Sequence, residues 1–462
     1  TDVASTLTSV DASAVEGSVE LALASADSVS SVSTGAGDDT IDAGVGDLTA
    51  TAQIGGGEGD DRLNLTGNGT TQFAMSGVQT LGLGAVGANG LTFSATNTEG
   101  LTTVESTEDL DGNATLANLG NQDLTVDVLG ANNGNGAVVQ SDHAGSTTVN
   151  VTGSSDAESD NRDVNDTNVT ASSSSFLNLN VGDTANYQGI VAAGDADSVV
   201  ADIQGQTTGA TVNAGAATAV DVTTGEGAST MTVGAADAVQ ATFNAGGNLT
   251  LNANSDFSGV EALTVESDGD FVNNTTLDAL NTATLSGKGS VTLDDVGAAD
   301  LGYGVDITAE GLSDGLTIDG AAATPYIQVG DGQTVSVDAS SVLGTVDLGA
   351  ITAGSQGSRG DVTVDVDGTG DDVTLGQITG ANVTVNAKGA LGTVTSSAGT
   401  TATNLGYDSL ANADVVASKS ATINGVELES NAVEVRSEGT TFEGTFNGGL
   451  KDDTVRIDLS NS

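Results

Sequence analysis

The chain has 462 residues, and its 63 Asp and Glu residues are opposed by only 9 Lys and Arg residues, which gives a net charge of -54. A surface this acidic repels a phosphate backbone, so nucleic acid is excluded as a partner. Cysteine is absent, which excludes a disulfide scaffold and any Cys-ligated metal centre.

The core must be filled mainly by small side chains. Hydrophobic residues make up 37% of the chain, whereas aromatic residues make up 3%. The hydrophobic share argues against acidic disorder. Stacked short strands bury Val, Leu and Ala side chains in ladders without large rings, so the composition favours a solenoid or layered β architecture.

Composition also bears on localisation. No apolar run approaches the roughly 18 residues of a membrane helix, so no membrane span is expected. The sequence starts at Thr1 without a visible Sec signal, and a mature or trimmed product is one interpretation. A Cys-free, acidic chain suits an extracellular protein with a large hydrated surface. The alternative is a cytoplasmic protein of a salt-loving organism.

The first element in chain order is the segment 11–26. Its Ala-containing pattern permits a short helix, whereas helical periodicity is weak in the rest of the chain. We therefore expect one helix at most, ahead of a chain made of strands.

Two acidic, glycine-rich loops follow. Residues 34–42 are TGAGDDTID, and residues 56–64 are GGEGDDRLN. The second segment matches the nonapeptide G-G-x-G-x-D-x-U-x, where U is a large apolar residue, and the first lacks only the initial glycine. Glycines permit a tight loop with inward carbonyls, the Asp adds a carboxylate, and the apolar residue anchors the next strand. These oxygen donors predict Ca²⁺ rather than Mg²⁺, which requires a stricter octahedron.

Strands with one buried face dominate the remaining sequence. Apolar residues alternate with Thr, Asn or Asp, as such strands require. The clearest segments are 124–128, 147–151, 176–181, 361–366 and 382–387.

The spacing of strands indicates their arrangement. From Val199 onward, strand centres recur in steps of about ten residues, separated by turn residues. They lie near Val200, Val212, Val222, Val233, Ala241, Leu251, Leu263 and Val272. Two steps make a coil of about twenty residues, so we predict an all-β fold built as a parallel β-solenoid. Layered antiparallel domains give similar spacing and stay open as an alternative.

A longer repeat suggests a division of the chain. FAMSGVQTLGLG at 73–84 recurs as FSGVEALTVES at 257–267, and the polar stretch 153–168 lies between the two copies. Such a stretch is typical of a boundary or a large surface loop. We expect an N-terminal β-repeat region over 1–152, a polar linker over 153–170, the main solenoid over 171–440 and a C-terminal cap over 441–462.

Two later segments repeat the acidic loop. Residues 448–456 are GGLKDDTVR, where Lys451 replaces a glycine, and residues 367–375, DGTGDDVTL, form a weaker copy. The competing interpretation is that Gly-Asp-Asp simply marks turns, as it does in any β protein.

The four loops together resemble the RTX family of calcium-binding repeat proteins. The Thr-, Ala-, Val- and Asn-rich β-repeats are similar to RTX-class bacterial surface-layer proteins. The resemblance implies several Ca²⁺ ions bound between turns of a β-roll, type I secretion, and folding in external calcium. The metal-binding groups that it implies are the carboxylates of Asp39, Asp61, Asp372 and Asp453 and the backbone of Gly35, Gly37, Gly57 and Gly59. The neighbouring acids of the same loops, Asp38, Asp42, Asp60, Asp371 and Asp452, complete the candidate metal-binding set. The copies are not in tandem, so single ions in loops are expected, and no C-terminal secretion signal is recognisable.

The expected function is structural. We expect a secreted, calcium-stabilised protein at the cell surface that associates with itself into a surface layer or fibre. The alternative is an RTX-type adhesin that binds a host or polysaccharide surface, and a polysaccharide-degrading β-helix enzyme ranks third. No catalytic residue is predicted, because His143 is the only histidine and the basic residues that bind acidic sugars are scarce.

Overall fold

A computed structural model gives the structure of the chain. It describes residues 7–23, 28–108, 110, 112–129, 139–140, 145–151, 169–171, 174–182, 187–205, 207–298, 302–318, 327–355, 358–387, 390, 394–396, 410–411, 413–424, 432–437, 443–447 and 454–458. These residues form strands and turns without a helix. The chain divides into two compact units, Thr1–Gly234 and Ala235–Ser462.

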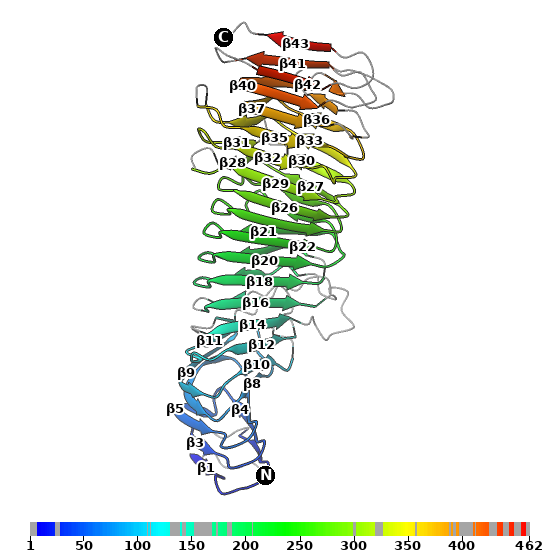
Figure 1. Ribbon diagram of the computed structural model, residues 1–462. Coiled ribbons are helices and arrows are strands. Elements are labelled where there is room, and N and C mark those ends of the chain that lie inside the picture. The colour runs from blue at the N-terminus through cyan, green and yellow to red at the C-terminus, as the bar shows by residue number, and fades with distance from the viewer. Residues whose placement is uncertain are drawn as a thin grey trace. The chain divides into compact units, whose positions relative to one another are not determined.

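Unit 1 is built from short parallel strands that stack turn upon turn (Figure 1). One sheet contains β1 (Ser9–Asp11), β3 (Val29–Ser33), β5 (Leu48–Gly55), β7 (Gly69–Ser76), β9 (Leu91–Glu99) and β11 (Ala114–Ala117). A second sheet, sheet B, contains β2 (Glu20–Ala22), β4 (Thr40–Gly44), β6 (Arg62–Thr66), β8 (Thr80–Leu83), β10 (Thr103–Ser106), β12 (Leu124–Val128), β14 (Ser146–Val151), β16 (Phe176–Val181), β18 (Ser198–Ile203) and β20 (Ala219–Thr224). A third contains β13 (Val139–Gln140), β15 (Val169–Thr170), β17 (Ile190–Ala192), β19 (Thr208–Asn213) and β21 (Ser229–Gly234).

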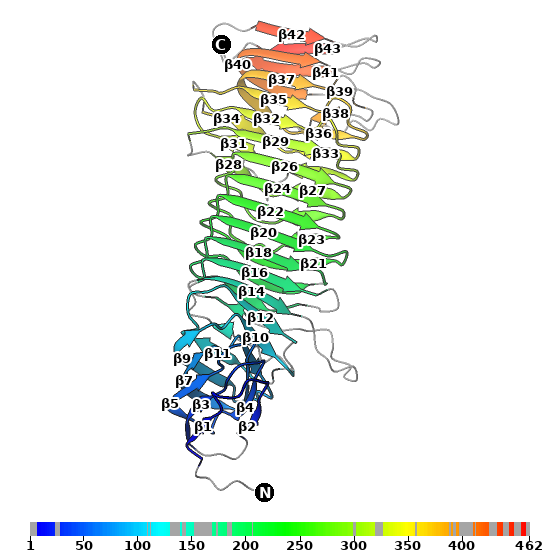
Figure 2. The same cartoon turned by 60° about the horizontal axis from the view of Figure 1, so that its bottom comes forward.

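Unit 2 has the same construction, with parallel strands in successive turns (Figure 2). Its longer strands are β22 (Gln240–Ala245), β24 (Ala262–Ser267), β26 (Thr282–Gly287), β29 (Val305–Glu310), β32 (Val335–Asp338), β35 (Val362–Asp365), β37 (Ile378–Asn386), β40 (Ala413–Asn424), β41 (Ala432–Ser437), β42 (Glu443–Asn447) and β43 (Thr454–Asp458). The facing strands are β23 (Leu249–Leu251), β25 (Phe271–Asn273), β27 (Ser290–Leu293), β30 (Gly315–Ile318), β33 (Thr345–Leu348), β36 (Val373–Leu375), β38 (Val394–Ser396) and β39 (Leu410–Ala411). A third strand per turn is added by β28 (Val296–Ala298), β31 (Ile327–Val329) and β34 (Ile351–Ala353).

The predicted parallel β-solenoid is confirmed, and the antiparallel alternative is wrong. All described strand pairs run parallel. The strand centres expected between Val200 and Val272 fall in eight consecutive strands, β18 to β25. The ten-residue step therefore does correspond to half a coil.

The core consists of ladders of aliphatic side chains. In sheet B, the register stacks Ile41 on Leu63, Leu63 on Leu81, and then Val104 and Val126, all of them buried. Each strand alternates buried and outward residues, so every turn adds one side chain to each ladder. Burying a Leu side chain in this way contributes about 2 kcal/mol.

Residues 11–23, the described part of the segment expected to be helical, form no helix. They contain the last residue of β1 and the whole of β2, with turns between the two strands. Asp11 pairs with Ser33, and Leu21 pairs with Ile41, so that Leu21 extends a ladder of the following turn. Pairing with a neighbouring strand outweighs the weak local helical pattern in this segment.

The two copies of the internal repeat, 73–84 and 257–267, each contain a turn of the solenoid that leads into a strand of sheet B. Val78 and Val260 are buried at equivalent places, just before β8 and β24. The carbonyl of Glu261 accepts the N–H groups of Asn281 and Thr282, and the carbonyl of Gln79 likewise accepts two N–H groups of the next turn. The linker expected over 153–170 lies largely outside the described residues and stays a prediction.

Candidate metal site

The two N-terminal acidic loops lie on adjacent turns at the same corner of unit 1. The loop 34–39 connects β3 to β4, and the loop 56–61 connects β5 to β6. Ala36 and Glu58 form a parallel bridge. Glu58 N–H donates to Gly35 O at 2.9 Å, and Gly37 N–H donates to Glu58 O at 2.8 Å. The two loops are therefore stacked backbone on backbone.

This stacking requires glycine. A Cβ on Gly57 would lie 1.9 Å from Gly35 O, and a Cβ on Gly59 would lie 2.5 Å from Gly37 O. Both residues also have positive φ angles, 98° and 130°, which side chains disfavour. The glycines of the motif thus bring carbonyl groups of one turn against the next turn.

Asp39 and Asp61 lie at the inner end of these loops. Each side chain is only 1% exposed. Asp61 Oδ1 accepts the N–H of Asp39 at 2.8 Å, and Asp39 Oδ1 accepts the N–H of Val19, one turn earlier, at 2.7 Å. One oxygen of each carboxylate therefore joins its turn to the previous one.

The second oxygen of each carboxylate has no partner among the residues that the structure describes. Asp39 Oδ2 and Asp61 Oδ2 are both buried and accept no hydrogen bond from these residues. A buried, unpaired carboxylate oxygen costs free energy unless a cation or a proton neutralises it. Arg62, which follows Asp61 in the chain, bonds instead to Asn64 and Glu105 on the outer face of sheet B. The neighbouring Arg62 therefore does not neutralise this pair of buried acids.

The electrostatics agree with this interpretation. Burial raises the pKa of the Asp61 carboxyl above its ordinary value of 3.8, and the charges of Asp39, Asp38 and Asp60 raise the pKa further. The hydrogen bond from the N–H of Asp39 opposes this rise. Without a cation, the folded chain therefore favours the protonated form of Asp61 more than the unfolded chain does.

This shift predicts a pH dependence in chelator. Because the folded pKa of Asp61 is raised, its contribution to stability is full below the unfolded value of 3.8 and is lost as the pH rises through the folded pKa. We expect Asp61→Asn to be more stable than the wild type at pH 7, with a gap in Tm that narrows as the pH falls toward 4. Thermal melts followed by circular dichroism measure this gap. A gap that widens on acidification would contradict the assignment, and Glu58→Gln, at an exposed acid of the same loop, is the control.

The other acids of these loops have different surroundings. Asp38 and Asp60 are exposed, and Asp60 N–H donates to Asp38 Oδ1 at 3.0 Å. Asp42 lies on the outer face of β4, where its Oδ1 accepts a 2.7 Å hydrogen bond from Asn64. The structure therefore brings together Asp39 and Asp61 inside the corner and places the other three acids outside it.

The third loop, 367–375, does not bury its acids. Asp371 and Asp372 are exposed, whereas Val373 and Leu375 point into the core. In the N-terminal loop one residue separates Asp61 from the buried Leu63, but here Val373 follows Asp372 directly. This one-residue change in alternation turns the Asp side chain to the solvent side. Asp452, Asp453 and His143 lie outside the described residues.

The donor atoms of Asp39 and Asp61 fit a cation that is ligated by oxygen atoms. Two carboxylate oxygens without partners and a glycine-lined corner match the hard donors that Ca²⁺ prefers. Over the described part of the chain, no group of three or more acidic or His side chains converges as a metal cluster. Backbone carbonyls and water would therefore have to complete the coordination sphere of an ion held by Asp39 and Asp61.

The nonapeptide motif did not identify Gln79, which also belongs to this corner. Gln79 Oε1 accepts the N–H of Asp61 at 2.6 Å, in the same role that Asp61 has toward Asp39. The only signal for Gln79 in the sequence is its place in the Ser-Gly-Val-Gln corner before an alternating strand.

Comparison of the chain with models of protein families, with curated proteins and with solved structures finds no match. Among the described residues, no helix is long and apolar enough to span a membrane. The functional argument therefore depends on the fold and on the corner formed by Asp39 and Asp61.

Proposed function

We propose that this chain is a secreted structural protein, stabilised by calcium, that associates with itself into an extracellular surface layer or fibre. The observation that carries the proposal is the stacked pair of buried carboxylates, whose Oδ2 atoms have no partner in the described part of the chain. A divalent cation held by Asp39 and Asp61 would join two adjacent turns of the solenoid. It would thereby couple the folding of unit 1 to external calcium.

The solenoid fold supports a structural role. In a parallel solenoid each turn contacts only its neighbours, and a repeated outer surface extends over many turns. Such a surface offers the same contacts at regular intervals, which suits a lattice or a filament. The RTX-like loops support export to a compartment that contains millimolar calcium, and type I secretion belongs to this proposal.

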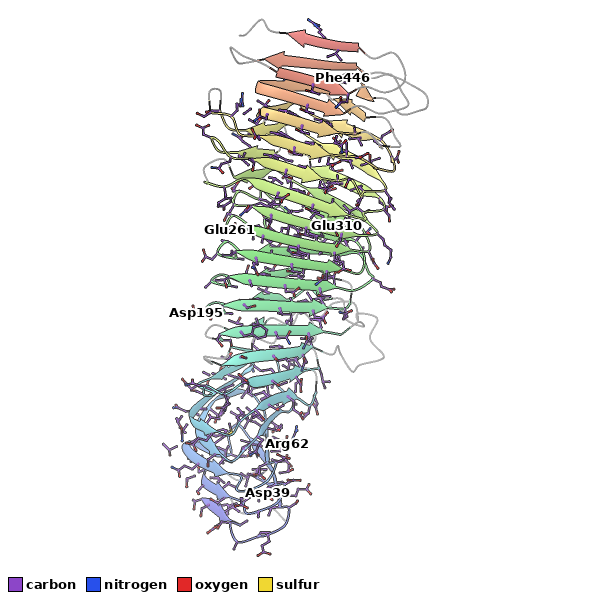
Figure 3. The ribbon with its side chains drawn as sticks, viewed as in Figure 1. Asp39, Arg62, Asp195, Glu261, Glu310 and Phe446 are labelled. Carbon is purple, nitrogen blue, oxygen red and sulfur yellow. The ribbon has the colours of Figure 1, made fainter. Side chains whose placement is uncertain are left out.

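Charge supports a role of cations between copies as well. Exposed acids are distributed over both units, with Asp195 in unit 1 and Glu261 and Glu310 in unit 2 as examples (Figure 3). Copies with a net charge of -54 repel each other. Divalent cations that bridge or screen such acids would lower this repulsion and permit close packing.

Electron microscopy of the purified chain tests the proposed assembly. We expect ordered sheets or filaments with millimolar calcium and dispersed particles after chelation. Sodium chloride at matched ionic strength is the control for simple screening. Dispersed monomers in calcium would contradict self-assembly and favour the adhesin alternative, whereas assemblies that resist chelation would contradict the role of calcium.

A further inference from the structure

A row of side chains runs through the corner of unit 1 from turn to turn. Asp39 caps the N–H of Val19, Asp61 caps the N–H of Asp39, and Gln79 caps the N–H of Asp61, with donor–acceptor distances of 2.7, 2.8 and 2.6 Å. In this row, one side-chain oxygen per turn binds the backbone of the previous turn. The three side chains have the same structural task.

Gln79 differs from the two acids in its second polar group. The second group of Asp39 and Asp61 is a carboxylate oxygen, buried and without a partner, whereas that of Gln79 is an amide nitrogen. This nitrogen faces the next turn, where a Cβ on Gly100 would lie 3.8 Å from it. An amide N–H₂ group donates hydrogen bonds and repels a cation, so the row of buried oxygens that could accept a cation stops at Asp61.

The loop that precedes Gln79 changes at the same point. Residues 34–39 and 56–61 form the wide loops before β4 and β6, but only residues 77–79 separate β7 from β8. Residues 100–102 form an equally short loop before β10. The wide glycine-lined corner therefore ends at the turn in which the acid is replaced by an amide.

We propose that Gln79 terminates the cation row: its carbonyl oxygen caps the turn of Asp61, and its neutral amide limits cation binding to Asp39 and Asp61. The inference rests on the proposed calcium binding and names the residue that limits it. A third stacked carboxylate would repel Asp61 unless another cation were bound. The amide avoids this repulsion and keeps the backbone hydrogen bond.

Gln79→Glu tests this role with little change of shape. Glu retains the oxygen that caps Asp61 N–H and replaces the amide nitrogen by a second carboxylate oxygen. We expect Gln79→Glu to bind one more calcium ion than the wild type in native mass spectrometry. We also expect a lower Tm than the wild type in chelator and a calcium-induced rise in Tm at least twice as large.

Two control variants separate the possible outcomes. Gln53→Glu adds the same charge on the exposed face of β5 and is expected to leave the ion count unchanged. Asp61→Asn is expected to lower the count relative to the wild type. An unchanged count in Gln79→Glu, while Asp61→Asn loses an ion, would overturn the role of Gln79 and leave the calcium site intact. An unchanged count in both variants would overturn the calcium site and this inference together.

The fold of the variant in chelator is itself informative. If Gln79→Glu is unfolded in chelator, recovery of its β-sheet circular dichroism on addition of calcium supports the proposal. Failure to recover overturns the proposal, because the added carboxylate then attracts no cation.

Discussion

The double variant Asp39→Asn, Asp61→Asn is expected to lose the calcium-dependent increase in the free energy of unfolding that we expect for the wild type. At a free calcium concentration 100 times the dissociation constant, one site contributes about 2.7 kcal/mol to the free energy of unfolding. The double variant should lose this response because Asn cannot offer the two charged Oδ2 atoms that are buried without partners. Urea unfolding with and without chelator measures the difference.

The same variant should be at least as stable as the wild type in chelator. Two carboxylates on adjacent turns about 5 Å apart repel each other by about 3 kcal/mol at an effective dielectric constant of about 20. Asn removes both charges and keeps the Oδ1 atoms that cap the N–H groups of Val19 and Asp39. A double variant that is much less stable in chelator would show that the carboxylates stabilise the corner without a cation.

The matched control uses the exposed acids of the same loops. Asp38→Asn with Asp60→Asn removes the same number of charges within the same residues 34–42 and 56–64. Because these side chains are exposed, we expect the calcium response to stay within about 0.5 kcal/mol of the wild type. An equal loss of response in both double variants would contradict a specific site at Asp39 and Asp61 and would favour diffuse screening of the acidic surface.

Gly57→Ala should have the second large effect. Its Cβ would lie 1.9 Å from Gly35 O, and its φ of 98° is unfavourable for any side chain. Strain and overpacking together cost about 2–5 kcal/mol. The loss should appear in the free energy of unfolding both with and without calcium, because the stacked backbones must separate in either condition.

Substitutions at two further glycines distinguish the cost of a positive φ from the cost of a steric clash. Gly69 has a φ of 113°, but a Cβ added there would have no neighbouring atom within 4 Å, so Gly69→Ala should cost only the strain, about 1–2 kcal/mol. Gly46 has neither a positive φ nor a close neighbour, and Gly46→Ala should be neutral or stabilise the chain by about 0.4–1 kcal/mol. Equal effects at Gly57 and Gly69 would contradict the close stacking of the two loops.

The strands and their inward residues followed from local alternation. Leu63, the apolar residue of the second glycine-rich loop, is 0% exposed, and the strands near Val149 and Leu179 alternate as predicted. Alternation is a local property because successive residues of a strand point to opposite sides. For that reason the all-β class and the coil of about twenty residues were readable without tertiary information.

The segment 11–26 shows where local patterns fail. Its spacing permits a helix, but Asp11 pairs with Ser33 and Leu21 pairs with Ile41, both in strands of the next turn. The gain from pairing with a strand far along the chain does not appear in a local window. Weak periodicity at the first turns of a solenoid is therefore a poor guide to their secondary structure.

The sequence by itself determined the short strands, the glycine loops and the acids in them, because these depend on residue type and on neighbours a few positions away. The tertiary structure decided which acids meet. The stacking of turns 22 residues apart places Asp61 against Asp39 and buries both, while the shifted alternation after Asp372 leaves that residue exposed. The stacking also brings Gln79 into the row, because Gln79 Oε1 accepts the N–H of Asp61 in the previous turn. These contacts depend on the register between turns, which brings residues that are distant in the chain to the same corner. The sequence of a single loop does not predict that register.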